Sequence, residues 1–267
     1  MNFEKPSREL SVGEILSLSF KLYRSKFLQF FLPYLISGII LGISTYAITS
    51  SFPLPTPPPI SAYRGAPLPY EELFEWFFAL LSAIIMISIL SGLVSWIVGT
   101  TITGVVIKNA SDQIEKGTSN LGVSFNFAIS KLPSLLVAQF VAGILTVIGM
   151  LLFIVPGIII AIMFSLVIPA IIVEQKGAFE SLGRSKKLVS NRWLKTFALS
   201  LVLGIIILPV GGIAYVLAMP FSTIHPIVNP LFISIIPAFV GPIYLIAITY
   251  LYYAMVAREI PPPPPTL

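Results

Sequence analysis

Long apolar stretches alternate with short polar segments along this chain of 267 residues. They cover about residues 28–50, 73–107, 133–173, 197–219 and 231–256, and the 41 residues of 133–173 suffice for two spans. About 20 apolar helical residues cross the ~30 Å hydrocarbon core of a bilayer. The pattern predicts an all-α, polytopic integral membrane protein with six transmembrane helices.

Proline and polar positions predict where these spans begin and end. Val155-Pro156-Gly157 predicts a tight turn that divides 133–173 into the third and fourth spans. Residues 108–132 have the polarity of a link, so Pro133 is expected at the first position of the third helix. Kinks are predicted at the prolines of the later spans, which are Pro169, Pro209, Pro237 and Pro242.

A basic segment before the first span has the pattern of an amphipathic helix. Ser11 and Glu14 have the spacing of a capping box. Lys21 and Arg24 continue the polar stripe of Glu14, and the apolar residues fall largely on the opposite face. We expect this helix to lie on the membrane surface.

This segment, ELSVGEILSLSFKLYRSKFLQFF at 9–31, has an echo in GAFESLGRSKKLVSNRWLKTF at 177–197. The identical pairs are Glu14/Glu180, Leu16/Leu182, Ser19/Ser185, Lys21/Lys187, Leu22/Leu188, Leu28/Leu194 and Phe31/Phe197. A weaker third copy at 119–136 places Leu121, Ser124 and Lys131 in register with Leu16, Ser19 and Lys26. The echo predicts three modules of a surface helix plus a membrane hairpin, at about 11–107, 117–173 and 177–256. The alternative is chance agreement between basic segments that precede membrane helices.

Charge supports the membrane class and predicts an orientation. Only 10% of residues are charged and the mean hydropathy is +0.96, whereas soluble domains average about 25% charged residues. Fifteen Lys and Arg residues fall on one side of the six-span pattern and only Arg64 on the other. By the positive-inside rule, both termini are expected in the cytoplasm and the protein in the cell membrane. Anionic lipid headgroups then become the expected partners of this charge, and nucleic-acid binding has no further support.

Two motif-bearing segments resemble a known family. VGEILSLSFKLYRSKF, and VPGIIIAIMFSLVIPAIIVEQKGAFESLGRSKKLVSNRW further on, are similar to the membrane domain found fused to some glycerophosphodiester phosphodiesterases and to its stand-alone, uncharacterised prokaryotic relatives. The resemblance implies a single six-helix membrane domain over 1–260, followed here by a proline-rich tail at 261–267. It implies no hydrolase activity, because the soluble phosphodiesterase domain is absent from this sequence.

Candidate catalytic groups are few. The chain has no cysteine, and its one histidine, His225, falls in a short loop. Glu71, Glu72 and Glu75 are a weak candidate for a divalent-cation site, or simply acids at a helix N-terminus. No nucleophile-elbow, phosphate-loop, zinc-protease or calcium-loop motif occurs. We therefore expect no enzyme, no cofactor and no metal.

Three other sets of residues are candidates for binding or packing. Gln139 is the most polar side chain of a span and suits either a helix–helix hydrogen bond or a polar pore. Small residues four apart predict close helix packing, within the chain or in a homo-oligomer; they are Gly38, Gly42, Ser91, Ser95 and Gly99. The repeated segments offer contacts to lipid headgroups or between modules, at Glu14, Lys21, Arg24, Glu180, Arg184, Lys187 and Arg192. Of these, Glu180 and Arg184 have the spacing of an ion pair.

The expected function follows from these absences. We expect a non-enzymatic membrane protein that engages lipids at its inner face and provides a path for a lipid or small solute. The alternative is an assembly or regulatory protein that binds a partner through its loops, and an intramembrane enzyme is the third hypothesis.

Overall fold

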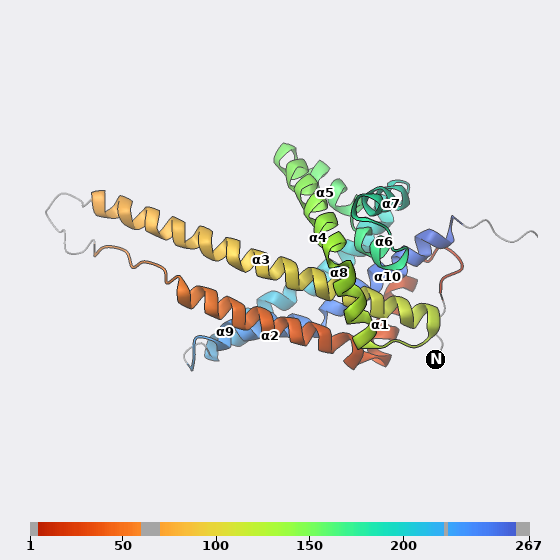
Figure 1. Cartoon of the computed structure of the whole chain (residues 1–267), viewed down its shortest axis with the longest axis horizontal. Coiled ribbons are helices and arrows are strands. Elements are labelled where there is room, and N and C mark those ends of the chain that lie inside the picture. Colours follow the sequence, from red (N-terminus) through yellow and green to blue (C-terminus); the bar gives the residue numbers. More distant parts are fainter. Residues whose placement is uncertain (1–4, 60–69, 222–223, 260–267) are drawn as a thin grey trace, which may run out of the picture.

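The computed structural model describes residues 5–59, 70–221 and 224–259 (Figure 1). The regular structure of this part of the chain is entirely helical, which confirms the all-α prediction. Its elements are α1 (Val12–Ser25), α2 (Phe27–Ser51), α3 (Tyr70–Lys116), α4 (Leu121–Leu152), α5 (Ile154–Met163), α6 (Val167–Val173), α7 (Ala178–Ser190), α8 (Trp193–Ala218), η2 (Met219–Phe221), α9 (Val228–Ile235), η3 (Ile236–Phe239) and α10 (Gly241–Ala257). The predicted tail at 261–267 lies outside the described residues.

Six helical segments in the described ranges are long and apolar enough to cross a membrane. They are Phe27–Ser51, Tyr70–Lys116, Leu121–Leu152, Ile154–Val173, Trp193–Phe221 and Val228–Ala257. Their number and order agree with the six predicted spans. The fourth segment is interrupted between α5 and α6, and the sixth contains η3 between α9 and α10.

The polar link at 108–132 is mostly helical, and the prediction that a helix begins at Pro133 was wrong. α3 continues to Lys116, where the carboxylate of Asp112 pairs with Lys108 at 3.0 Å and with Lys116 at 2.7 Å, each four residues away. Such pairs stabilise a helix that apolar patterning alone does not predict. α4 begins at Leu121 behind the Asn120 cap. Pro133 therefore lies inside α4 and not at its start.

A turn between α4 and α5 divides the long apolar stretch, as predicted, but it lies slightly earlier in the chain. Phe153 alone is extended, and Val155-Pro156-Gly157 forms the first turn of α5. The two helices approach closely at Gly149 and Gly157. A Cβ placed at Gly157 would lie 2.7 Å from the backbone nitrogen of Met150, a separation that only glycine permits.

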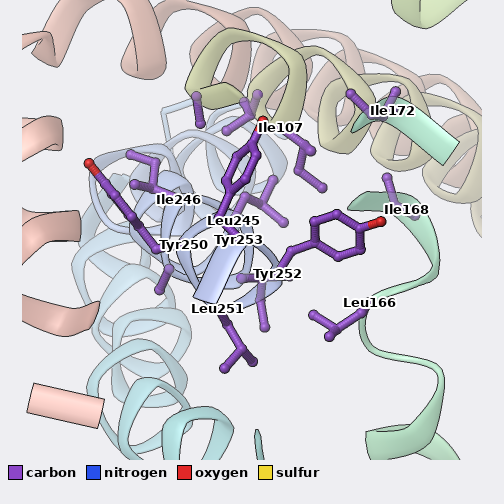
Figure 2. Packing of buried hydrophobic residues seen from close by; sticks show 14 of the residues in the cluster. Ile107, Leu166, Ile168, Ile172, Leu245, Ile246, Tyr250, Leu251, Tyr252 and Tyr253 are labelled. Atoms are coloured by element: carbon purple, nitrogen blue, oxygen red, sulfur yellow. The ribbon is translucent and has the colours of Figure 1, made fainter. Parts of the chain in front are cut away.

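The buried core lies at one end of the bundle. It contains the C-terminal part of α3, all of α6 and nearly all of α10. Figure 2 shows Tyr253 beside Ile107 of α3 and Tyr252 directed toward Ile168 of α6, whereas Tyr250 lies near Ile246 on the other side of α10. All three tyrosines are at most 1% exposed. Aliphatic and tyrosine side chains thus fill the interior of this region of the described structure.

Three further segments pack around this core. α1 contacts α10, the first turns of α4 contact α3, and α7 contacts α6. Each of these segments carries one serine of the sequence echo, and Ser19, Ser124 and Ser185 are all 0% exposed. We call this region, with the C-terminal ends of α3 and α10, the charged end (Figure 1).

Away from the charged end the helices diverge. In Figure 1 the α4–α5 hairpin and the N-terminal part of α3 point in different directions. Between Tyr70 and Gly99 no residue of α3 is buried, although this is one of the most apolar parts of the chain. A surface of this kind suits contact with lipid and not with water.

We predict that Gly157→Ala destabilises the fold by about 1–3 kcal/mol, because the added methyl group would overlap the backbone of Met150. Gly204→Ala in α8 is the matched control, since a Cβ there meets nothing within 4 Å. Thermal unfolding of the purified variants in detergent measures the difference. Equal midpoints for the two variants would contradict the close approach of α4 and α5.

Candidate functional site

A cavity of about 340 Å³ lies where the helices diverge from the core. Ile107, Ile168 and Leu245 belong both to its wall and to the packed core. The cavity therefore ends against the core. Its other lining residues include Thr103, Gln139, Gly143, Thr146, Phe164, Ser165, Pro169, Tyr244 and Ile248, which come from α3, α4, the α5–α6 break, α6 and α10.

Gln139 is the main polar group of this cavity. Its side-chain oxygen accepts a hydrogen bond from the Thr100 hydroxyl of α3 at 3.1 Å. In this orientation its amide nitrogen donates to no other described residue. Thr100 is 2% exposed, so the pair links α3 and α4 inside the protein and leaves two N–H groups available at the cavity wall.

A second, apolar groove adjoins the cavity. It has a volume of about 500 Å³ and lies along α3 and α4, lined by Leu93, Trp96, Gln139, Phe140, Gly143, Ile144, Val147 and Ile148. Gln139 and Gly143 line both spaces. The polar cavity is thus continuous, through these two residues, with an apolar surface between α3 and α4.

The α5–α6 break forms one wall of the cavity. Phe164–Leu166 have no α-helical conformation, and Pro169 cannot donate the backbone hydrogen bond that the carbonyl of Ser165 would otherwise accept. The Ser165 hydroxyl donates to the carbonyl of Ile162 at 2.8 Å. Non-helical backbone within an apolar span is tolerated where it lines a cavity or is buried in protein.

The chemistry that this cavity offers is neutral. No Asp, Glu, Lys, Arg or His is among its lining residues, and the described residues contain no group of three potential metal ligands. Amide and hydroxyl groups bind esters, alcohols and amides, and the surrounding apolar wall suits hydrocarbon.

The charged end is held by ion pairs between segments distant in sequence. Arg184 of α7 contacts Glu174 at 2.8 Å and Glu259, which follows α10, at 2.7 Å. Glu9 receives a hydrogen bond from Lys195 of α8 at 2.8 Å, and Arg192 lies 3.3 Å away. The hydrogen bonds from Lys195 and Arg184 hold the pKa values of Glu9 and Glu259 below their usual range. These carboxylates therefore stabilise the fold when ionised.

The pKa of Glu174, also at the charged end, reflects opposing effects of burial and of neighbouring groups. Burial acts to raise the pKa of its carboxyl, but the hydrogen bond from Arg184 and the nearby Lys176 lower it by more. The pKa of Arg184 is raised in return, chiefly by its hydrogen bond with Glu259. Arg184 is 13% exposed at its side chain, so it is a partly buried cation between two carboxylates.

The predicted surface contacts are only partly brought together. Arg184, Lys187 and Arg192 face acidic groups of other segments. Glu14 instead pairs with Arg8 of its own N-terminal arm, and this contact, together with the capping bond from Ser11, lowers its pKa to about 2.

The other predicted contacts point to solvent or to the surface of the bundle. Arg184 turns away from Glu180, so the expected pair between them is absent. Lys21, Arg24 and Glu180 are exposed and form no ion pair within the described part of the chain.

The remaining candidates have structural surroundings. Gly38 and Gly42 allow α9 to approach α2, where a Cβ would meet Ser234 and Leu231. Gly99 has open space around it, and Ser95 is exposed. Ser91 is partly buried. His225 lies 5.8 Å from the ring of Tyr46. Glu71, Glu72 and Glu75 are exposed in the first turns of α3.

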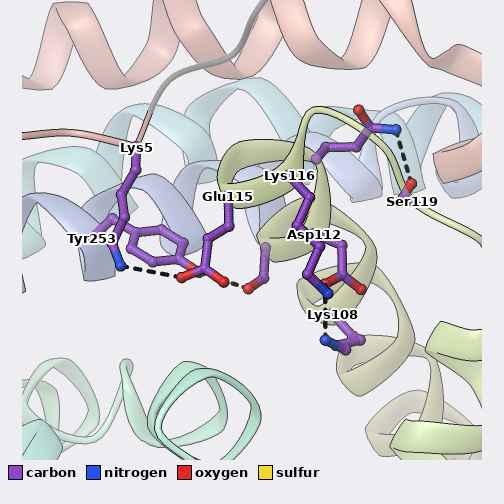
Figure 3. A network of polar contacts seen from close by, with 9 residues as sticks. Lys5, Lys108, Asp112, Glu115, Lys116, Ser119 and Tyr253 are labelled. Carbon is purple, nitrogen blue, oxygen red and sulfur yellow. Dashed lines mark hydrogen bonds and ion pairs between the residues drawn. The ribbon is translucent and has the colours of Figure 1, made fainter.

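A polar cluster at the end of α3, with a buried part around Asn109 and Asp112 and exposed groups at Lys5 and Lys116, was not predicted from the sequence (Figure 3). Asp112 lies between two lysines, and Lys5 reaches Glu115 at 3.2 Å. The fully buried Asn109 donates to the Gln29 carbonyl at 3.2 Å, a carbonyl that Pro33, four residues on, cannot satisfy. The four-residue spacing of Lys108, Asp112 and Lys116 was the available signal.

Comparison with known proteins gives one match. The model of a family described as a domain of unknown function matches residues 72–259, well over half of the chain. This segment begins in the first turn of α3 and includes every cavity-lining residue named above. No curated protein and no solved structure matches the chain significantly. The resemblance to a phosphodiesterase-associated membrane domain stays a prediction.

We predict that Arg184→Gln lowers the free energy of unfolding by about 1–3 kcal/mol, because Glu174 and Glu259 would lose their shared partner. The effect should shrink as the pH falls through the folded-state pKa values of these carboxylates, which lie below the ordinary 4.5, because the stabilisation by their ionised forms is then lost. Thermal unfolding at several pH values measures it. The control is Lys186→Gln, since Lys186 is exposed on the same helix. Equal losses in the two variants would contradict the bridging role of Arg184.

Proposed function

We propose that this chain, which belongs to the family of unknown function DUF7847, is a polytopic membrane protein that binds a neutral lipid in the cavity around Gln139. The protein has no catalytic role in this proposal. The ligand class is one with an ester or hydroxyl group and at least one hydrocarbon chain.

The proposed topology places the charged end at the cytoplasmic face. The uneven distribution of lysine and arginine supports this orientation, with both termini inside the cell. α1 and α7 then lie at the inner membrane surface, where the exposed Lys21 and Arg24 contact anionic headgroups. With 47 residues, α3 is about 70 Å long. It therefore extends beyond a ~30 Å hydrocarbon core or tilts within it.

A three-module construction is also part of this proposal. The support is that α1, α7 and the start of α4 each pack on an even-numbered span, and that each buries the equivalent serine. Lys26 and Arg192, equivalent in the echo, share a similar backbone conformation before the following long helix, with φ −125° and −142°. In the middle module the corresponding Lys131 lies within continuous α4.

The amide group of Gln139 is the single observation that carries the ligand proposal. Gln139 lies on an apolar span, its side-chain oxygen accepts a hydrogen bond from Thr100, and the residue lines both the cavity and the apolar groove. A polar donor is costly within a membrane unless it has a partner. The carbonyl oxygen of a lipid ester is a suitable partner, because its hydrocarbon chain can occupy the adjoining groove.

Packing of the core favours a binding site over a conducting path. The cavity ends against Ile107, Ile168 and Leu245, below which the buried tyrosines fill the bundle. A path for ions or small solutes would need a continuous polar lumen. The neutral lining further favours an uncharged lipid over an anionic one.

The alternative of a protein partner rests on segments outside the described residues. It assigns binding to the proline-rich loop or to the tail. Residues 60–69 and 260–267 contain much of these segments, and the structure does not describe them.

We predict that a diacylglycerol with a photoactivatable diazirine on one acyl chain labels the purified protein within 139–148 and 164–169. Gln139→Leu should reduce this labelling about fivefold, since it removes about one hydrogen bond to the ester. Peptide mass spectrometry after irradiation locates and quantifies the label.

Thr49→Val is the matched control. Thr49 also lies on an apolar helix, but its hydroxyl donates only to the backbone carbonyls of Thr45 and Tyr46 in that same helix. Labelling of the cavity peptides should be unchanged in this variant. Equal labelling in Gln139→Leu and wild type would contradict the proposed site.

A further inference from the structure

A side chain from α7 bridges the interruption between α5 and α6. The Ser185 hydroxyl donates to the carbonyl oxygen of Met163 at 2.6 Å and accepts from the backbone nitrogen of Leu166 at 3.1 Å. Ser185 is 0% exposed. One buried hydroxyl thus pairs a free carbonyl and a free N–H group on the two sides of the break.

These two backbone groups are the ones that a continuous helix would use. In an α-helix, Val167 would donate to the Met163 carbonyl and Leu166 to the Ile162 carbonyl. Instead the Met163 carbonyl accepts from α7, and the Ile162 carbonyl accepts from the backbone nitrogen of Ser165 at 3.2 Å. The hydroxyl therefore competes directly with helix formation across the break.

We propose that Ser185 is a positioning residue for the cavity: its hydroxyl keeps the α5–α6 span interrupted and so holds Phe164 and Ser165 in the cavity wall. Both residues line the cavity and belong to the break itself. In a continuous helix, the regular helical turn would change the direction in which the side chains of Phe164 and Ser165 point relative to α6. The inference rests on the proposed function only in that the same cavity binds the ligand.

α7 is fixed well enough to hold this hydroxyl in place. The residue before Ser185 is Arg184, which pairs with Glu174 after α6 and with Glu259 after α10. The same α7 face buries Leu188 and Val189 against the core. The ion pairs of Arg184 at the charged end thus fix the position of the Ser185 hydroxyl. Through this one side chain, they act on the cavity wall.

The chain supplies a matched comparison in the equivalent serine of α1. Ser19 is also 0% exposed, but its hydroxyl donates to Ile15 of its own helix at 2.6 Å. Removing that hydroxyl leaves no interhelical bond broken. Ser19→Ala therefore reproduces the loss of a buried hydroxyl without touching the break.

The experiment uses a single cysteine in this naturally cysteine-free chain. Ser165→Cys is introduced, and its rate of reaction with N-ethylmaleimide is measured on the full-length protein in detergent, without added lipid. Ser185→Ala should slow labelling about fivefold, because the span becomes continuous and turns the new thiol from the cavity. Ser185→Thr, which retains a hydroxyl, should restore the rate, and Ser19→Ala should leave it unchanged.

A double variant tests the state without the hydroxyl further. Pro169→Ala, added to Ser185→Ala, restores the N–H that the carbonyl of Ser165 lacks, so the double variant should be labelled no faster than Ser185→Ala alone, whereas Pro169→Ala with Ser185 intact should leave the rate close to that of the parent. As a folding control, Thr49→Cys on α2 is combined with each of these substitutions in place of Ser165→Cys. Its rate of labelling by N-ethylmaleimide should stay unchanged. An unchanged rate at position 165 in Ser185→Ala, or an equal fall in Ser19→Ala, would overturn the proposal. Since no lipid is present, this result is independent of the diacylglycerol labelling.

Discussion

The rest of the structure depends on the packing of α10 against the C-terminal part of α3 and against α6. α10 is buried along nearly its whole length by the end of α3, by α6 and by the surrounding α1 and α7. Its fully buried tyrosines fill the space that a channel would need. The cavity around Gln139 borders this closely packed region at Ile107, Ile168 and Leu245. The proposed ligand is accordingly one that enters from the bilayer.

The charged end and the cavity are parts of one arrangement. Ion pairs hold α7 and the start of α8 to segments far away in the sequence. For a short amphipathic helix such as α7, these pairs add to the stability that burial of its apolar face provides. Beyond the core the α4–α5 hairpin and the N-terminal part of α3 diverge. The cavity lies at this transition, with Gln139 on one wall and the helix break on another.

The sequence predicted the helical class, the number and order of the long apolar helices, and a helix–helix hydrogen bond as one of two roles for Gln139, because hydropathy and isolated polarity are local properties. It did not predict the continuation of α3 to Lys116, where ion pairs and a buried asparagine override the polar composition. The kink predicted at Pro169 lies next to the α5–α6 break, but the hydrogen bonds that Ser185 makes across this break were not predicted, because Ser185 comes from another helix. The partners of Arg184 were missed for a related reason. Glu174 and Glu259 are brought to it by the tertiary fold, whereas Glu180 was merely close in sequence.

The closed core is tested most directly by solute permeability. The purified protein is reconstituted into liposomes, and the release of a small neutral solute such as glycerol is followed by stopped-flow light scattering. The account predicts the same rate as in protein-free liposomes, because Tyr250, Tyr252 and Tyr253 leave no continuous lumen. A protein-dependent increase in the rate would contradict the closed core and, with it, the assignment of the cavity as a dead-ended lipid site.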